Sequence, residues 1–252
     1  GELALETGQM LTPPGISYLA GMGIEKVKVF LNPVISIIVT GKELIRPGST
    51  ITEGKIFESN SSGLSAALDQ VHISPFSVEV VDDTEEEIIN TIQRQLQSDI
   101  LILTGGISVG DYDLVSPALE KIGVKKIFHK VKQKPGKPFY FGTYNQTLVY
   151  ALPGNPAAVL TCFYEYIVPV ISHYTRKEYF RKLTIPLADD FTKKPGLTYF
   201  LKGKINQNSV SVLDNQESYL MNSFAKADCI IELDEDKEHF RQGDPVPVRM
   251  IY

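Results

Sequence analysis

Two hydrophobic patterns divide the chain near Arg176. Before this point, short runs of aliphatic and β-branched residues alternate with longer segments whose apolar positions recur at helical spacing. This pattern predicts strands over residues 34–40, 77–81, 99–104, 125–131 and 147–152. It predicts helices over residues 12–23, 60–70, 84–97, 115–122 and 156–174. Because buried strands that alternate with helices favour parallel pairing, we expect an α/β fold with a mostly parallel sheet and helices on both faces.

Two of the helix starts carry capping signals. Thr12 precedes Pro13, which suits the first turn of a helix. Asp83 or Thr84 precedes the Glu86–Glu87 pair at the spacing of a capping box. These signals predict where both helices begin.

Beyond Arg176 the apolar alternation becomes shorter and turn residues separate the segments. It predicts strands over residues 183–188, 197–205, 210–213 and 246–251. We therefore expect a leading segment over 1–32, an α/β domain over 33–176 and a small all-β domain, a barrel or sandwich, over 177–252. The last part contains no catalytic motif, so we interpret it as a packing or accessory domain.

Composition narrows the class of protein. The 252 residues are 43% hydrophobic and 22% charged, which excludes a disordered or fibrous chain. No apolar run approaches the roughly 20 residues of a bilayer span, and a net charge of -5 disfavours general nucleic-acid binding. Cys162 and Cys229 lie far apart, which disfavours a disulfide framework and favours a reducing, cytosolic setting. The four histidines show no metal-ligand spacing.

Unusual loops follow four of the predicted strands. They cover residues 41–44, 82–83, 104–113 and 153–156. In an open parallel sheet, ligands bind outside the carboxyl ends of the strands. We therefore expect these four loops to converge on one crevice.

The loop over residues 104–113 is rich in glycine. Gly105, Gly106 and Gly110 allow main-chain amides to wrap around a phosphate, and Thr104 and Ser108 add hydroxyl groups. The spacing matches neither the dinucleotide fingerprint nor the P-loop. A tight turn without a ligand is the alternative interpretation of the glycine pair.

Carboxylates in the same loops suit Mg²⁺, which prefers oxygen ligands. Asp111 and Asp113, together with Glu43 and one of Asp82 or Asp83, are the candidates. For Asp83 the alternative is a helix cap, because an Asp that opens a helix often serves only that purpose.

A concentration of positive charge follows. Seven lysines and no acidic residue occur between residues 121 and 137: Lys121, Lys125, Lys126, Lys130, Lys132, Lys134 and Lys137. Residues 134–138 read Lys-Pro-Gly-Lys-Pro, which places Lys134 and Lys137 on a stiff bend suited to an anion. Alternate lysines Lys130, Lys132 and Lys134 share one side if the segment is extended. A solvated face is the alternative.

The turn over residues 153–156, Pro-Gly-Asn-Pro, leads into a helix. Pro153 and Pro156 fix the backbone direction, and the unpaired amides near Asn155 favour an anion. A plain strand-to-helix turn is the alternative. Cys162 lies within the following apolar helix without an adjacent histidine, which disfavours a nucleophile.

Together, four motifs resemble the MoeA family of molybdopterin molybdenumtransferases. They cover residues 40–44, 105–113, 134–138 and 152–156, and their order and spacing match as well. The resemblance implies a three-layer MogA/MoaB-like domain followed by that family's β-rich last domain. It implies insertion of molybdenum from molybdate into adenylylated molybdopterin with Mg²⁺ and release of AMP. Carried onto matching positions, it points to Glu43, Asp82 or Asp83, Asp113, Lys130, Lys134, Pro153 and Pro156.

The resemblance also implies small-molecule substrates and a homodimer at full length, and it allows a MogA-like adenylyltransferase as a partner. Two departures stand out. Lys42 occupies a position where the family usually has Asp, and nothing matches the family's large N-terminal portion. Residues 1–31 resemble the segment that returns from that portion, which predicts a truncated chain that binds ligand but catalyses poorly.

Two other functions compete with this hypothesis. One is adenylylation of molybdopterin by ATP, as in MogA-like proteins, but the motifs at 134–138 and 153–156 and the β-rich end favour MoeA. The other is an interaction scaffold without catalysis. The retained lysines and carboxylates favour chemistry over a scaffold.

Overall fold

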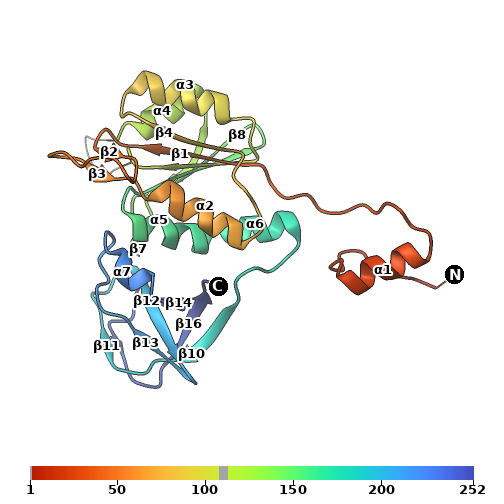
Figure 1. Ribbon diagram of the computed structural model, residues 1–252. Helices are drawn as coiled ribbons and strands as arrows, with labels where there is room; N and C mark the ends of the chain where they lie inside the picture. The colour runs from red at the N-terminus through yellow and green to blue at the C-terminus, as the bar shows by residue number, and fades with distance from the viewer. Residues whose placement is uncertain (1, 108–112) are drawn as a thin grey trace.

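The computed structural model describes residues 2–107 and 113–252 and is built around a six-stranded central sheet (Figure 1). Its strands, in spatial order, are β4 (Ser77–Val81), β1 (Ile35–Thr40), β5 (Ile100–Thr104), β9 (Thr147–Leu152), β8 (Tyr140–Tyr144) and β6 (Lys125–His129). The first four are parallel to one another, whereas β8 is antiparallel to both of its neighbours, β9 and β6. The predicted parallel sheet is therefore confirmed over four strands.

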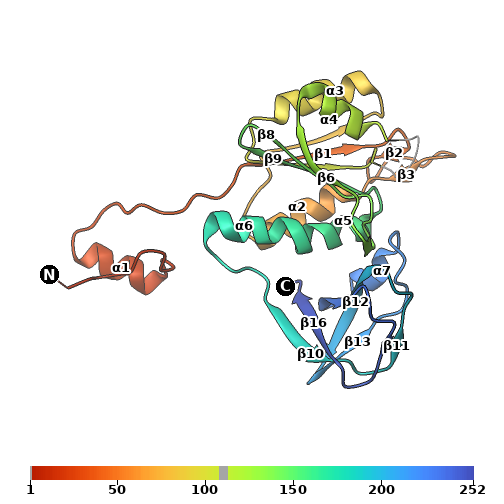
Figure 2. The ribbon, with the colours of Figure 1, turned by 180° about the vertical axis from the view of Figure 1, so that it is seen from behind.

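Helices cover both faces of this sheet, as Figures 1 and 2 show. One face carries α3 (Glu85–Gln95) and α4 (Val115–Ile122). The other carries α2 (Asn60–Gln70), α5 (Pro156–Cys162), the π-helical segment η1 (Phe163–Ile167) and α6 (Val168–Thr175). All six positions of β1 are buried because alternate side chains enter two different cores. The predicted three-layer α/β architecture is confirmed.

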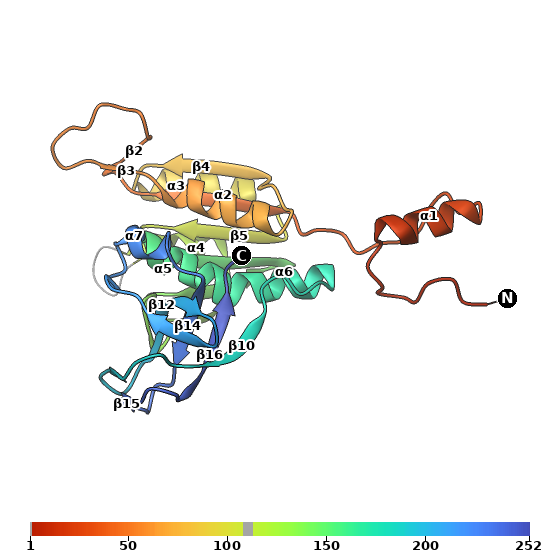
Figure 3. The same ribbon diagram turned by 60° about the horizontal axis from the view of Figure 1, so that its bottom comes forward.

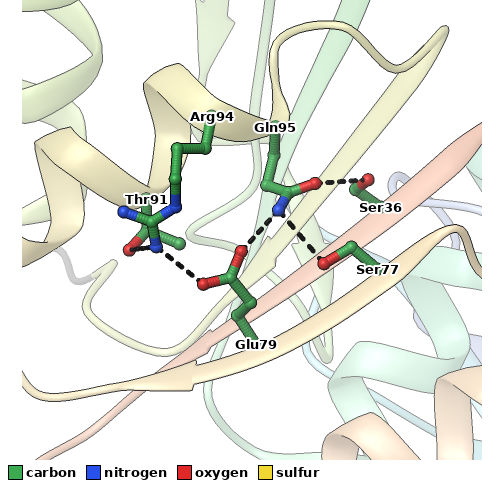
Figure 4. Close-up of polar contacts among 6 residues, drawn as sticks. All are labelled: Ser36, Ser77, Glu79, Thr91, Arg94 and Gln95. Atoms are coloured by element: carbon green, nitrogen blue, oxygen red, sulfur yellow. Dashed lines mark hydrogen bonds and ion pairs between the residues drawn. The ribbon is translucent and has the colours of Figure 1, made fainter.

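A polar network fixes the edge strand β4 and helix α3 beside β1 (Figure 4). Buried Ser36 donates to Gln95 Oε1 over 2.9 Å, and Gln95 Nε2 donates to Ser77 Oγ over 3.1 Å. The same amide also donates to Glu79, which Arg94 holds at 2.7 Å. The network pairs every strongly polar group that it buries, which specifies the register of the sheet edge.

The long helix expected over 156–174 is confirmed, with the π-helical turn η1 inside it. Two other local predictions are wrong. The capping box expected at α3 does not form, because Thr84 makes no side-chain cap bond. Lys130 adopts a left-handed backbone with φ of 75°, so the segment after β6 is not regularly extended. Lys130 therefore does not share one side of an extended segment with Lys132 and Lys134, as was expected.

A second sheet occupies the C-terminal part of the chain. It contains β10 (Lys182–Pro186), β16 (Pro245–Met250), β14 (Cys229–Leu233), β12 (Thr198–Asn206) and β13 (Ser209–Val212). The short strands β11 (Phe191–Thr192) and β15 (His239–Phe240) pair separately, and α7 (Met221–Phe224) contacts α5. The expectation of a mainly β end is confirmed, although β14 was not predicted; β8 of the central sheet was not predicted either.

The two sheets are joined by one strand. β7 (Gln133–Lys134) leaves the α/β part and pairs in parallel with β12, so that Lys134 lies opposite Tyr199. The lysine-bearing segment is consequently held by the C-terminal sheet. This link brings the C-terminal domain next to the carboxyl ends of the central strands.

Two segments project from this body. Helix α1 (Pro13–Gly21) lies apart from it on an extended segment, and Thr12 Oγ1 accepts the Gly15 amide as its N-cap (Figure 1). Strands β2 (Leu44–Ile45) and β3 (Ile56–Phe57) pair at the base of a loop that extends outward (Figure 3). Among residues 2–107 and 113–252, no helix has the length and apolarity needed to cross a membrane.

Candidate active site at the strand ends

The loops that follow β1, β5 and β9 pack directly against one another. A Cβ on Gly105 would lie 2.0 Å from the Thr40 carbonyl oxygen, and the φ of +85° at Gly105 also requires glycine. A Cβ on Gly154 would lie 3.6 Å from the Cα of Gly105. The structure thus brings these three loops together, as the topology predicts.

The loop after β4 joins them through Asp83. Asp83 Oδ1 and Thr40 Oγ1 lie 3.6 and 2.6 Å from the point that a Cβ on Gly106 would occupy. Both oxygens are buried, and neither has a hydrogen-bond partner in the part of the chain that the structure describes. Asp82 is exposed, so Asp83 is the member of the pair that faces inward. Since Thr84 occupies the N-cap of α3, Asp83 is not the cap.

Asn60, at the start of α2, joins the loops after β5 and β9 and was not predicted as a site residue. Its Nδ2 donates to Thr104 Oγ1 over 3.0 Å and to the Gly154 carbonyl over 2.8 Å. Its Oδ1 is buried and lacks a partner among the described residues. An Asn at a helix start usually indicates only a cap, so no pattern in the sequence singled it out. We call Thr40, Asn60 and Asp83 the strand-end cluster.

The strand-end cluster consists of oxygen donors, which is the chemistry that Mg²⁺ requires. Within residues 2–107 and 113–252, no three His, Cys, Asp or Glu side chains form a group that could hold a metal ion alone. A single carboxylate with neutral oxygens is nonetheless compatible with Mg²⁺, because proteins commonly hold this ion with one or two carboxylates, water and substrate phosphates. Buried oxygens without partners are expected where a ligand supplies the missing contacts.

Other predicted carboxylates lie around this cluster. Asp113 Oδ1 accepts the Ser116 amide over 2.9 Å and Oδ2 accepts the Ser116 hydroxyl over 2.7 Å, so Asp113 holds the first turn of α4. Glu43 is exposed, with Oε1 3.0 Å from the Cβ position of Gly41. The predicted site residues Ser108, Gly110 and Asp111 lie outside the described residues.

The lysine bend, residues 134–138, is packed against helix α5. Gly136 has φ of +89°, and a Cβ there would lie 2.7 Å from Cys162 Sγ. Buried Gln133 donates to the Pro135 carbonyl over 3.0 Å and contacts the same sulfur at 3.6 Å. Burial raises the pKa of the Cys162 thiol to about 12, so this cysteine is a packing residue and not a nucleophile.

The lysine segment is only partly neutralised. Lys121 is paired with Glu85, and Lys126 with Glu120 at 2.8 Å. Over the described residues, no carboxylate lies within ion-pair distance of the four lysines nearest the bend: Lys130, Lys132, Lys134 and Lys137. The ammonium of Lys134 lies 5.2 Å from the centroid of the Tyr199 ring. Positive charge is therefore retained around the bend.

A cavity of about 320 Å³ separates the lysine bend from the turn at residues 153–156. Its walls include Lys134, Lys137, Pro153 and Asn155 from the predicted motifs, and also Leu197, Gln216 and Ser218 from the C-terminal domain. This size suits a small ligand. The sequence predicted the motif residues but not the wall from the C-terminal domain.

Ser218 binds the turn directly. Its hydroxyl accepts from Asn155 Nδ2 over 2.8 Å, and its carbonyl accepts the Ala157 amide over 3.0 Å. One free amide that was expected at the start of α5 is therefore already bonded, and Pro156 has none to offer. Whether this turn binds an anion stays a prediction, with fewer donors than the sequence suggested.

Comparisons with known proteins assign both parts of the chain. Residues 36–173 match the model of the probable molybdopterin binding domain, and residues 184–251 match that of the MoeA C-terminal region, domain IV. The molybdopterin molybdenumtransferase of Haemophilus influenzae is 30% identical over 98% of this chain, and that of Synechocystis is 32% identical over 98%. The chain spans about 63% of the length of these curated relatives.

A solved structure agrees with these matches. The molybdopterin biosynthesis MoeA protein from Pyrococcus horikoshii superposes with a TM-score of 0.82 at 27% identity. The match covers 99% of this chain and 62% of that one. The similarity therefore includes both sheets and the segment before them.

Proposed function

The chain belongs to the MoeA family, and on this premise we propose that it carries the substrate-binding part of a molybdopterin molybdenumtransferase. The proposed reaction inserts molybdenum from molybdate into adenylylated molybdopterin, with Mg²⁺, and releases AMP. It contributes a step to the biosynthesis of the molybdenum cofactor. The two relatives named molybdopterin molybdenumtransferase support the transfer of molybdenum to molybdopterin in this proposal.

One observation carries the proposal: the same end of the central sheet presents unsatisfied oxygens on one side and unneutralised ammonium groups on the other. The oxygens are those of Thr40, Asn60 and Asp83. The ammonium groups belong to the lysine bend. This arrangement suits a substrate whose phosphate groups bind a cation on the oxygen side, together with a second anion that binds at the ammonium groups.

The roles of the residues follow from their chemistry. Asp83, with the neighbouring Thr40 hydroxyl, would hold Mg²⁺, which neutralises phosphate charge when it is bound. Lys134 and Lys137 attract the anionic molybdate or phosphate, and Lys130 extends this positive field. The glycine pair Gly105–Gly106 lets the phosphate approach the backbone. Catalysis of this kind depends mainly on positioning and electrostatics.

Direct binding tests the proposal. Titration of the chain with adenylylated molybdopterin in the presence of Mg²⁺ and molybdate is expected to show saturable binding, followed by release of AMP. Because the chain spans about 63% of its relatives, we expect release to be slower than for a full-length relative. Absence of binding at saturating protein would contradict the proposal, and ATP-dependent adenylylation of molybdopterin would favour the adenylyltransferase alternative.

The lysine bend gives a sharper prediction. Lys134→Ala is expected to weaken binding of adenylylated molybdopterin or molybdate on the order of 10-fold, because one charge-assisted contact is lost. Lys126→Ala is the matched control, since Lys126 is paired with Glu120 and lies away from the bend. Calorimetry on both variants, at two salt concentrations, measures the difference. Equal losses in the two variants would remove the special role of Lys134.

The same proposal includes assembly and location. We propose that the longer protein is a homodimer that works in the cytoplasm and can receive substrate from an adenylyltransferase. Exposed apolar side chains support a subunit contact at α1: Ile16 and Tyr18 on the helix and Met22 directly after it. Light scattering on the full-length protein tests the dimer.

A further inference from the structure

The C-terminal sheet contains an unusual buried lysine. Lys202, in β12, is only 4% exposed, although an ammonium group is costly to bury. Its Nζ donates to three backbone carbonyls, of Asn215 at 2.7 Å, Leu220 at 3.2 Å and Glu217 at 3.3 Å. All three acceptors belong to the loop between β13 and α7. The Lys202 ammonium group therefore holds three carbonyls of that loop together, as a bound metal ion would.

The backbone of Lys202 holds the same loop. Its amide donates to Gln216 Oε1 over 2.9 Å, and its carbonyl accepts from Gln216 Nε2 over 2.9 Å and from the Leu213 amide over 3.0 Å. Ser223 adds a bond to the Asn215 carbonyl over 2.7 Å. Asn215 itself is left-handed, with φ of 58°. The loop therefore has one defined shape, and Lys202 makes more of its contacts than any other residue named here.

This loop delivers Ser218 to the candidate site. Ser218 lies between Glu217 and Leu220, whose carbonyls the ammonium binds, and its own groups bind Asn155 and the Ala157 amide. Gln216 and Ser218 also line the cavity beside the lysine bend. A displacement of the loop would move one wall of the cavity and release the first turn of α5.

We propose that Lys202 is a positioning residue of the candidate active site, acting through the loop of residues 213–220 on the start of α5. It does not touch the cavity, and its effect passes through Ser218. This inference rests on the proposed function, because it assigns Lys202 to the site that binds adenylylated molybdopterin. Loss of the ammonium group should loosen the loop and the turn at residues 153–156 together.

Two variants on the same strand test this inference. Lys202→Met removes the charge while keeping similar length, and Lys204→Met makes the same change two residues away. Lys204 is a matched control because its side chain is 48% exposed and paired with Asp228 at 2.6 Å, outside the loop. We expect affinity for adenylylated molybdopterin to fall on the order of 10-fold in Lys202→Met and to stay unchanged in Lys204→Met.

Amide hydrogen exchange of the ligand-free protein supplies a readout that needs no substrate. In Lys202→Met, exchange should accelerate in peptides covering residues 153–160 and 213–220, while β14 stays protected. Lys202→Arg keeps a positive charge with several donors and should restore most of the protection. The two regions thus report on positioning, whereas a general loss of folding would expose β14 as well.

The outcomes separate the two proposals. Unchanged exchange at residues 153–160, general exposure of β14, or an Arg variant that behaves like the Met variant would each overturn the role of Lys202. If the unsubstituted chain fails to bind adenylylated molybdopterin, the proposed function fails. The exchange measurement then still decides whether Lys202 positions the start of α5.

Discussion

Asp83→Asn is expected to lower the rate of AMP release about 100-fold while changing the free energy of unfolding by less than about 1 kcal/mol. The reason is the environment of the carboxylate. Asp83 Oδ1 is buried beside the glycine pair and makes no hydrogen bond within the described residues, so it contributes little to folding. An amide has nearly the same shape but carries no charge for Mg²⁺ or a phosphate-bound cation.

Asp82→Asn provides the control for this prediction. The two aspartates are adjacent, but Asp82 is exposed and Asp83 is turned inward. The control should therefore keep both the AMP-release rate and the melting temperature of the unsubstituted chain. Single-turnover AMP release and thermal melting of both variants make the comparison. If Asp83→Asn melts much lower yet releases AMP normally, the carboxylate is structural and not part of the site.

The contrast between these neighbours shows what the sequence could predict about the site. Strand periodicity predicted that the residues after β4 would reach the crevice, but it left the choice between Asp82 and Asp83 open. That choice depends on how the chain enters α3, where Thr84 and not Asp83 takes the N-cap. Capping preference alone does not distinguish two Asp residues and a Thr in succession.

The fold was more predictable than the site because hydrophobic periodicity acts locally. α2, α4, β4 and β9 have the predicted bounds, since apolar runs and turn residues mark both ends of each. β8 was not predicted because its residues, Tyr140–Tyr144, follow the lysine bend without an alternating pattern. It pairs with β9 in a tight hairpin across Asn145 and Gln146, and these two residues lack the Asn-Gly or Asp-Gly pair that marks such a turn in a sequence.

Contacts between distant segments account for what was missed in the cavity. Asn60 binds Gly154 across 94 positions of sequence, and Ser218 binds Asn155 across 63. Neither residue belongs to a motif with a chemical signature of its own. Asn60 reaches the turn at residues 153–156 because α2 packs against α5, and Ser218 reaches it because β7 joins β12 and brings the C-terminal domain against that turn. Contacts of this kind between distant segments become visible only in the three-dimensional structure.

Arg249→Met is expected to reduce the free energy of unfolding by about 3 to 5 kcal/mol, the largest effect on stability that we predict. Arg249 in β16 pairs with Glu165 in η1 at 2.9 Å, and the two side chains are 13% and 6% exposed. The pair joins the C-terminal sheet to the helical layer of the α/β part. Removing only the arginine leaves a buried carboxylate without its counter-ion, which costs more than the pair contributes. Urea denaturation measures the loss.

Two further measurements identify the stranded carboxylate as the cause. Replacing both partners, as Glu165→Gln with Arg249→Met, should recover much of the lost stability because no charge stays buried.

Burial already raises the pKa of Glu165 above 4.5, and Arg249 opposes this shift, so loss of the arginine should raise the pKa further. The folded state then binds the proton more tightly than the unfolded state does, and stability falls as pH rises from about 4.5 through the folded-state pKa. The single variant should therefore lose less stability at pH 5 than at pH 8, and a deficit independent of pH would assign the loss to packing of the arginine side chain instead.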